Sequence, residues 1–299
     1  MEVLNTFYHL VPITPVQGLL YAFVAMGVMI PFRLLNVPDL TAEGAFPLGG
    51  CLVAALITAG LHPFLGTLAA AGAGFLAGAV TALIHLKFRV HSLLAGILTI
   101  TMLWSVDLRV MGKPNTPLFG LPNLYDWIDP AIMQSLALQG GLLLGALVVL
   151  VLLLWWGLHT DVGLALRGVG ANSQLAPALA VDSTRYIVVG LGLANAITAA
   201  AGALLAQSQG YGDVNMGFGM LINGLAALII GEAIIGRRTL LRQLCAPVVG
   251  SLLYYQLSSL VLSFGLMPSD LKLVTGLFVL VTIGWPILRG RARAGSIAG

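Results

Sequence analysis

The sequence predicts an all-α membrane protein, a single transmembrane domain built as a bundle of about eight to nine spans. The chain has 299 residues, of which 59% are hydrophobic and only 8% are charged, whereas soluble domains have about 25% charged residues. Apolar runs of about 20 residues recur along the chain, and each is long enough to cross a hydrocarbon core of about 30 Å. The runs are continuous rather than alternating, which favours helices over the strands of a membrane barrel.

Nine apolar runs are candidate transmembrane helices. They occupy residues 17–35, 43–60, 63–86, 92–108, 140–158, 185–208, 216–236, 243–263 and 271–288. The second run is polar at its start and rich in glycine, so a broken or partial helix, with eight full spans, is the alternative. The N-terminus has no basic segment followed by an early cleavage site, so we expect the first run to be retained as a helix.

The positions of the basic residues predict the orientation of the chain. With the C-terminal tail inside, only Arg109, Lys113 and Lys272 of the 14 Lys and Arg residues lie in outer segments. This bias agrees with the enrichment of basic residues in cytoplasmic loops. The outer segment 109–139 is then expected to be an ordered loop with one short helix, and the segment 159–185 lies inside.

The inner segment 159–185 contains a candidate docking helix. Asn172 or Ser173 can cap its N-terminus, and Asp182 follows it. The residues on one face of this helix are Leu175, Ala176 and Leu179. A short capped helix on the cytoplasmic side is a candidate docking element for a soluble partner, and an ordinary loop is the alternative.

Several polar residues lie within or beside the apolar runs, where each is costly and is therefore a functional candidate. The candidates for a substrate pathway or gate are Asn36, Asp39, Thr41, Glu43, Asn195, Thr198, Gln207 and Asn223. Asp39 and Glu43 are four residues apart, so we expect them to share a helix face at the cytoplasmic edge. They form either a gate or a hydrogen-bonded interface with Arg33 as a candidate ion partner. The amides either line the pathway or join helices by hydrogen bonds.

Two further acidic residues have basic neighbours. Glu232 precedes Arg237 near the inner surface, so ion pairing or docking of a partner is preferred to substrate binding. Asp107 lies near Arg109 at the outer end of its helix, and a local pair reaching toward the membrane surface is expected.

Small residues suggest close packing of helices. Two Gly-x-x-x-Gly pairs allow helices to approach closely: Gly74 with Gly78, and Gly141 with Gly145. Cys51 and Cys245 lie in apolar stretches without metal-ligand spacing, and we interpret them as small core residues.

Three stretches match a known set of motifs in order. Residues 165–202 contain Arg-Gly-Val-Gly-Ala-Asn and later Leu-Ala-Val-Asp-Ser-Thr-Arg-Tyr, residues 36–44 are Asn-Val-Pro-Asp-Leu-Thr-Ala-Glu-Gly, and residues 216–231 form a Gly- and Ala-rich helix. Together they resemble the permeases of ABC importers for branched-chain amino acids and ribose-type sugars. The resemblance covers about residues 17–288 and is strongest to a branch associated with aromatic amino acid uptake.

The resemblance implies a fold, a location and partners. The fold would be that of a type II ABC importer permease in the bacterial inner membrane, with a cytoplasmic C-terminus. A second copy would complete a homodimer, two cytoplasmic ATP-binding subunits would dock beneath it, and a periplasmic or lipoprotein solute-binding protein would approach the periplasmic loop 109–139. The residues implied in ATPase coupling are Arg167, Asn172, Ser173, Leu175, Ala176, Leu179, Asp182 and Glu232. ATP and Mg would bind to the partner, and no cofactor to this chain, whose sequence has no Walker A motif.

The predicted function is passage of a small neutral or zwitterionic solute, an amino acid of the aromatic or branched-chain class. An ion-coupled secondary transporter is the main alternative, but Asp39 and Glu43 have no obvious counterpart in the second half of an inverted repeat. An enzyme is disfavoured because the five His residues lie in different segments. Nucleic-acid binding is disfavoured because the basic residues are dispersed between apolar runs, where they anchor the chain in lipid.

Overall fold

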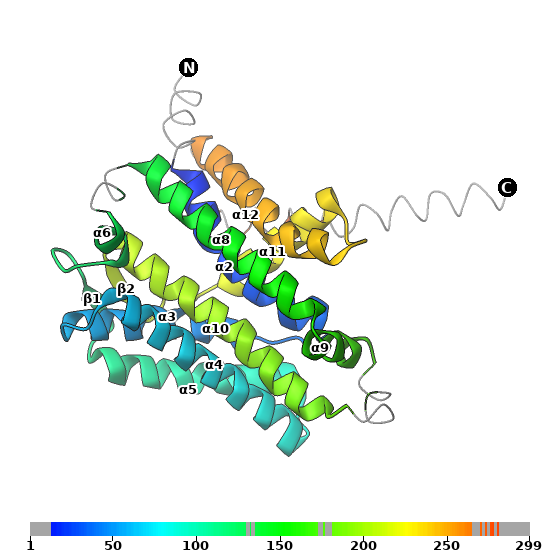
Figure 1. Ribbon diagram of the computed structural model, residues 1–299. Helices are drawn as coiled ribbons and strands as arrows, with labels where there is room; N and C mark the ends of the chain where they lie inside the picture. Colours follow the sequence, from blue (N-terminus) through cyan, green and yellow to red (C-terminus); the bar gives the residue numbers. More distant parts are fainter. Residues whose placement is uncertain are drawn as a thin grey trace.

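The apolar runs form helices in the computed structural model (Figure 1). The structure describes residues 13–129, 135–172 and 181–264, together with the isolated residues Ile132, Ala176, Asp270, Leu273, Gly276, Leu277 and Leu280. Within these residues, six helices are long and apolar enough to cross a membrane. They are α2 (Thr14–Met29) with its π-helical extension η1 (Ile30–Leu34), α4 (Pro63–Phe88), α5 (Ser92–Met111), α8 (Leu136–His159), α10 (Ser183–Gln209) and α12 (Leu240–Ser263). The predicted span 271–288 lies outside the continuously described residues.

Two further apolar helices are shorter than a full span. They are α3 (Ala42–Thr58) and α11 (Met220–Ile235), with 17 and 16 residues. A crossing helix needs about 20 residues, so both are shorter than a full span. The short helix α3 corresponds to the second predicted run, residues 43–60, and agrees with the alternative that this run is a partial helix.

The interruption before α3 has a local cause. Pro31 lies within η1, whose wider turn closes through the hydrogen bond from the Leu35 N–H to the Ile30 carbonyl oxygen. The chain then turns at Asn36, which has a φ of 53°, a left-handed conformation that asparagine tolerates better than most residues. Residues 37–40 have no regular secondary structure, and they lead from the exposed Asn36 to the buried Asp39.

Helix α10 lies at the centre of the bundle and packs against α2, α3 and α4. Glycine allows these close approaches, because a Cβ added at Gly49 of α3 or at Gly74 or Gly78 of α4 would collide with the backbone of α10. The prediction for Gly74 and Gly78 is therefore confirmed. At Gly141 and Gly145 of α8, nothing in the described chain lies within 4 Å of an added Cβ, so this pair makes no close helix contact within the described chain.

A two-stranded ribbon closes one end of the bundle. Strand β1 (Asn115–Pro117) pairs antiparallel with β2 (Tyr211–Asp213), and the short helix α6 (Leu124–Ile128) follows β1. The ribbon joins the connection after α5 to the connection after α10. Both connections were assigned to the outer side of the membrane, and their pairing places them at one end of the molecule (Figure 1).

Helix α9 (Asp161–Ala171) lies at the opposite end of α10 (Figure 1). The Thr160 hydroxyl accepts a hydrogen bond from the Gly163 N–H and caps α9. Asn172 follows the last residue of α9, and most of the docking helix predicted after it, residues 173–175 and 177–180, lies outside the described residues. Thr160 and Asp161 begin α9, and Gly168 and Gly170 lie within it.

Candidate functional site

An ion pair joins η1 to α11 at the end of the bundle where α9 lies. The Arg33 guanidinium donates from Nε to Glu232 Oε1 at 2.8 Å and from Nη2 to Glu232 Oε2 at 2.6 Å. Arg237 Nε lies 3.7 Å from the same carboxylate. The structure thus gives Glu232 the ion-pairing environment that was preferred for it. Arg33 pairs with Glu232, however, and not with Asp39 or Glu43, because η1 directs it toward α11.

Asp39 lies in the interior of the bundle and is only 1% exposed. Its Oδ2 accepts a hydrogen bond from Asn195 Nδ2 at 2.7 Å, and its Oδ1 accepts one from the Thr41 N–H at 2.9 Å. Asn195 lies near the middle of the 27-residue helix α10. Asp39 is therefore deeper than the cytoplasmic edge at which it was predicted, because residues 37–40, the non-helical segment before α3, enter the bundle.

Thr41 connects three helices through hydroxyl groups. Its Oγ1 lies 2.7 Å from Thr81 Oγ1 of α4, and the Thr81 hydroxyl lies 2.8 Å from Thr99 Oγ1 of α5. All three side chains are buried. Sequence reasoning selected Thr41 but not the other two, since a helical threonine can satisfy its hydroxyl on its own backbone and so gives no distinguishing signal.

Glu43 has a different environment from Asp39. Its Oε1 accepts a hydrogen bond from the Gly219 N–H at 2.6 Å, which ties the start of α3 to the start of α11. Because α3 begins at Ala42, Asp39 precedes the helix. The prediction that Asp39 and Glu43 share one helix face is therefore wrong.

Among the remaining predicted pathway residues, Asn36 is exposed at the turn after η1, and the other three make hydrogen bonds or packing contacts between helices. Gln207 donates to Thr67 Oγ1 at 2.9 Å and accepts from the Leu124 N–H at 2.9 Å. Asn223 Oδ1 accepts from the Tyr254 hydroxyl at 3.0 Å. Thr198 packs against α2, where a Cβ added at Gly27 would collide with it. These contacts favour the helix-joining interpretation over pathway lining.

The predicted coupling residues are only partly described. Arg167 lies on α9, and its Nε is buried without a hydrogen-bond partner among the described residues. Ala176 is buried, and Asp182 caps α10 and pairs with Arg185. Ser173, Leu175 and Leu179 lie outside the described residues.

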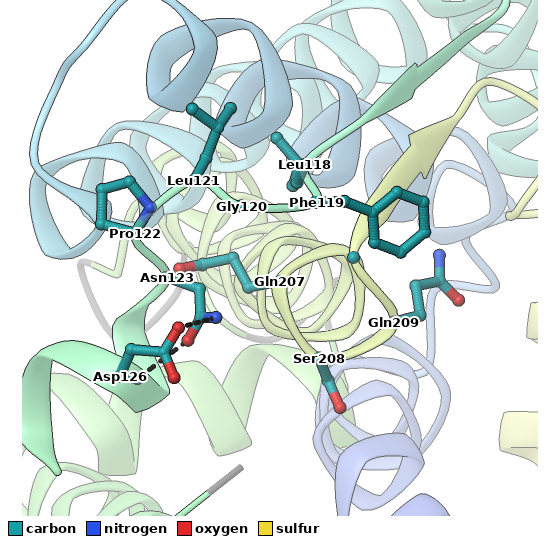
Figure 2. A pocket seen from close by; sticks show the side chains of 11 residues that line it. Leu118, Phe119, Gly120, Leu121, Pro122, Asn123, Asp126, Gln207, Ser208 and Gln209 are labelled. Carbon is teal, nitrogen blue, oxygen red and sulfur yellow. Dashed lines mark hydrogen bonds between the residues drawn. The ribbon is translucent and has the colours of Figure 1, made fainter. Parts of the chain in front are cut away.

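A pocket of about 400 Å³ lies beside the ribbon end of the bundle (Figure 2). It is lined by Leu118, Phe119, Gly120, Leu121, Pro122, Asn123, Asp126, Gln207, Ser208, Gln209 and Gly210. Asn123 caps α6 by accepting from the Asp126 N–H at 2.9 Å. Beside this pocket the Tyr125 hydroxyl donates to the Leu204 carbonyl oxygen at 3.2 Å, and burial raises the pKa of this phenol above its usual range. The outer loop is therefore held on the end of α10.

A second cavity, of about 270 Å³, lies between α3, α5 and the segment after β2. It is lined by Glu43, Gly44, Pro47, Ile100, Trp104, Asp107, Val214, Asn215, Gly217 and Phe218. Asp107 is 1% exposed, and neither of its carboxylate oxygens has a hydrogen-bond partner among the described residues. The expected pairing with Arg109 is wrong, because residues two apart on a helix point in different directions and Arg109 is exposed.

Six long apolar helices in the described residues, with a few polar side chains buried among them, indicate a multi-pass membrane protein. A protein-family model described as "Branched-chain amino acid transport system / permease component" matches residues 14–284. The chain belongs to this family of permeases.

Two relatives match most of the chain. A tyrosine transport system permease protein of Clostridioides difficile (strain R20291) is 37% identical over 264 residues, covering 88% of this chain and 87% of the relative. An uncharacterized protein of Rickettsia prowazekii (strain Madrid E) is 32% identical over 277 residues, covering 89% and 94% of the two chains. No solved structure matches the chain significantly.

Proposed function

We propose that this chain is the permease subunit of an ATP-driven ABC importer and forms the pathway for an amino acid, with aromatic amino acids as the preferred class. The observation that supports this most directly is the interrupted segment between η1 and α3, which places Asp39 against Asn195 in the interior of a transport permease. Broken helices that bring polar groups to mid-membrane are a feature of solute pathways. The aromatic preference is taken from the relative that is named a tyrosine transport system permease protein.

The proposal includes an assembly. Two copies of the chain form a homodimer in the bacterial inner membrane, with their C-termini in the cytoplasm. Two ATP-binding subunits contact the segment 159–185 and supply ATP and Mg, and a periplasmic or lipoprotein solute-binding protein delivers the solute at the ribbon end. The paired outer connections and the ion cluster at the opposite end are consistent with this orientation.

The contacts of α9 suggest how ATP binding could move the pathway. A Cβ added at Gly170 of α9 would collide with the carbonyl oxygen of Leu34, the last residue of η1. The next residue, Leu35, packs its side chain on Gly190 of α10. A displacement of α9 therefore acts directly on the segment that leads to Asp39. A switch between two states requires a contact that differs between them, and we propose that the contact of α9 with η1 is this contact.

Reconstitution tests the proposal. The permease, with its ATP-binding subunit and solute-binding protein, is placed in proteoliposomes, and uptake of radiolabelled tyrosine is measured with and without ATP. Uptake that depends on ATP and on all three components is the expected result. Uptake by the isolated permease driven by a proton or sodium gradient would establish the secondary transporter instead.

A further inference from the structure

The cavity between α3 and α5 is lined by a buried carboxylate that has no hydrogen-bond partner among the described residues. Asp107 lies on the wall that α5 contributes, and Glu43 lies on the wall that α3 contributes. The two carboxylates differ in one respect. Glu43 already accepts the Gly219 N–H at 2.6 Å, while both oxygens of Asp107 are unpartnered in the described part of the chain.

An unpartnered acidic group within a membrane protein is costly, because neither lipid nor apolar side chains hydrogen-bond to it. None of the described residues that line the cavity is basic, so the described part of the chain provides no counter-ion there. The arrangement therefore favours a ligand that brings a positive charge and hydrogen-bond donors to Asp107. A primary ammonium group provides both.

The other walls fit the remaining parts of an amino acid. Trp104 and Phe218 supply aromatic surface, and Pro47 and Ile100 supply aliphatic surface. Asn215 adds an exposed amide, a group that donates hydrogen bonds to a carboxylate. The volume of about 270 Å³ is slightly below the range of about 300–1,000 Å³ for pockets that hold drug-sized ligands, which suits one small solute.

The cavity lies where a solute coming from the ribbon end would first enter the bundle. Val214 follows β2 directly, and Asp107 is four residues before the end of α5. Glu43 lies on the wall nearer the interrupted segment. Asp107 is therefore closer to the outer ribbon, and Glu43 is closer to the Asp39 network.

We infer that this cavity is an amino acid binding site in which Asp107 accepts the primary ammonium group and Trp104 and Phe218 contact the apolar side chain. This inference rests on the proposed transport function and assigns the position at which the permease itself first binds its solute.

An analogue series on the unaltered chain tests the inference without any substitution. Binding to the purified permease–ATPase complex, in the absence of the solute-binding protein, is measured by calorimetry for tyrosine, tyramine and 3-(4-hydroxyphenyl)propionate. Tyrosine and tyramine, which have the ammonium group, are expected to bind, and the propionate is expected to bind at least tenfold more weakly. Equal binding of all three, or binding of none at millimolar concentration, would overturn the inference.

Substitutions identify the residue. Asp107→Asn is expected to weaken tyrosine binding about tenfold to a hundredfold, the loss of a charge-assisted hydrogen bond, and Asp107→Glu is expected to restore part of it. Trp104→Ala weakens binding, while Met102→Ala, an exposed position on the same helix that does not line the cavity, leaves it unchanged. If Asp107→Asn instead dissociates the permease dimer and leaves binding intact, Asp107 pairs with the second copy and the inference is wrong.

Failure of the inference is distinguishable from failure of the proposed function. If the unaltered permease imports tyrosine with ATP and Asp107→Asn imports it equally well, the function stands and the site is wrong. If the unaltered permease imports no tyrosine in the complete system, the transport proposal fails first.

Discussion

Asp39 and Asn195 are 156 residues apart in the sequence, and they meet in the interior through a hydrogen bond of 2.7 Å. The carboxylate also accepts the Thr41 N–H, so each of its oxygens has one donor. A buried polar pair of this kind is stable while both members are present, and it becomes costly when one is removed. The pair therefore fixes the position of residues 37–40, the non-helical segment before α3, relative to α10.

Removal of the amide tests this pair. Asn195→Leu leaves one oxygen of Asp39 without a donor and is expected to destabilise the protein by about 1–3 kcal/mol, measured as a lower midpoint of thermal unfolding in detergent. The loss is expected to be smaller in an Asp39→Asn background, where the buried group is neutral. Equal losses in both backgrounds would show that the two residues are not coupled.

At the scale of the element, glycine sets how closely helices approach. Gly74 of α4 lies against the backbone of α10, while Gly145 of α8 faces open space. Gly74→Ala is therefore expected to destabilise the bundle by about 1–3 kcal/mol through overpacking. Gly145→Ala is the matched control and should be neutral or slightly stabilising, since alanine favours a helix over glycine. A comparable loss of thermal stability in both variants would contradict the close packing of α4 on α10.

Helix α9 allows a similar comparison for coupling. Gly170→Val introduces a side chain against Leu34 and is expected to separate α9 from η1, whereas Gly168→Val on the same helix adds one in open space. In the reconstituted importer, Gly170→Val should reduce tyrosine uptake by about tenfold or more while ATP hydrolysis continues, a loss within the usual range of coupling between sites. The proposed route from α9 to Asp39 is wrong if both variants transport at the same rate.

The helices themselves were largely predictable from the sequence. The run predicted at 185–208 corresponds to α10 (Ser183–Gln209), because its hydrophobicity and length fix the element. The helix over 161–171 was missed because its glycines resemble loop signals, although Thr160 and Asp161 begin it. The burial of Asp107 beside the cavity and the depth of Asp39 were also missed, because both depend on which elements pack together.

At the scale of the whole molecule, the two ends of the bundle differ in chemistry. One end has the paired strands and the pocket beside α6, and the other has the ion pair of Arg33 with Glu232 and the helix α9. The enrichment of basic residues in cytoplasmic segments assigns the second end to the cytoplasm. This assignment is a proposal about the membrane, and it can be tested directly.

Labelling with a membrane-impermeant thiol reagent in intact cells tests the orientation. In a background with Cys51→Ala and Cys245→Ala, the variant Asn115→Cys places a thiol on the exposed ribbon, and Arg238→Cys places one on the exposed turn after α11. Once the reagent has access past the outer envelope, Asn115→Cys is expected to react, and Arg238→Cys only after permeabilisation. The opposite pattern would reverse the topology.

The strand pairing also constrains the order of assembly during synthesis. Asn115 and Asp213, which are bonded through their side chains, are 98 residues apart. At a synthesis rate of about 5–20 residues per second, the second strand follows the first from the ribosome after about 5–20 s. During that interval β1 has no partner strand, and α6 lacks the end of α10 that later holds it. The ribbon end therefore closes only after α10 has been synthesised, and a chain arrested before residue 211 would expose it.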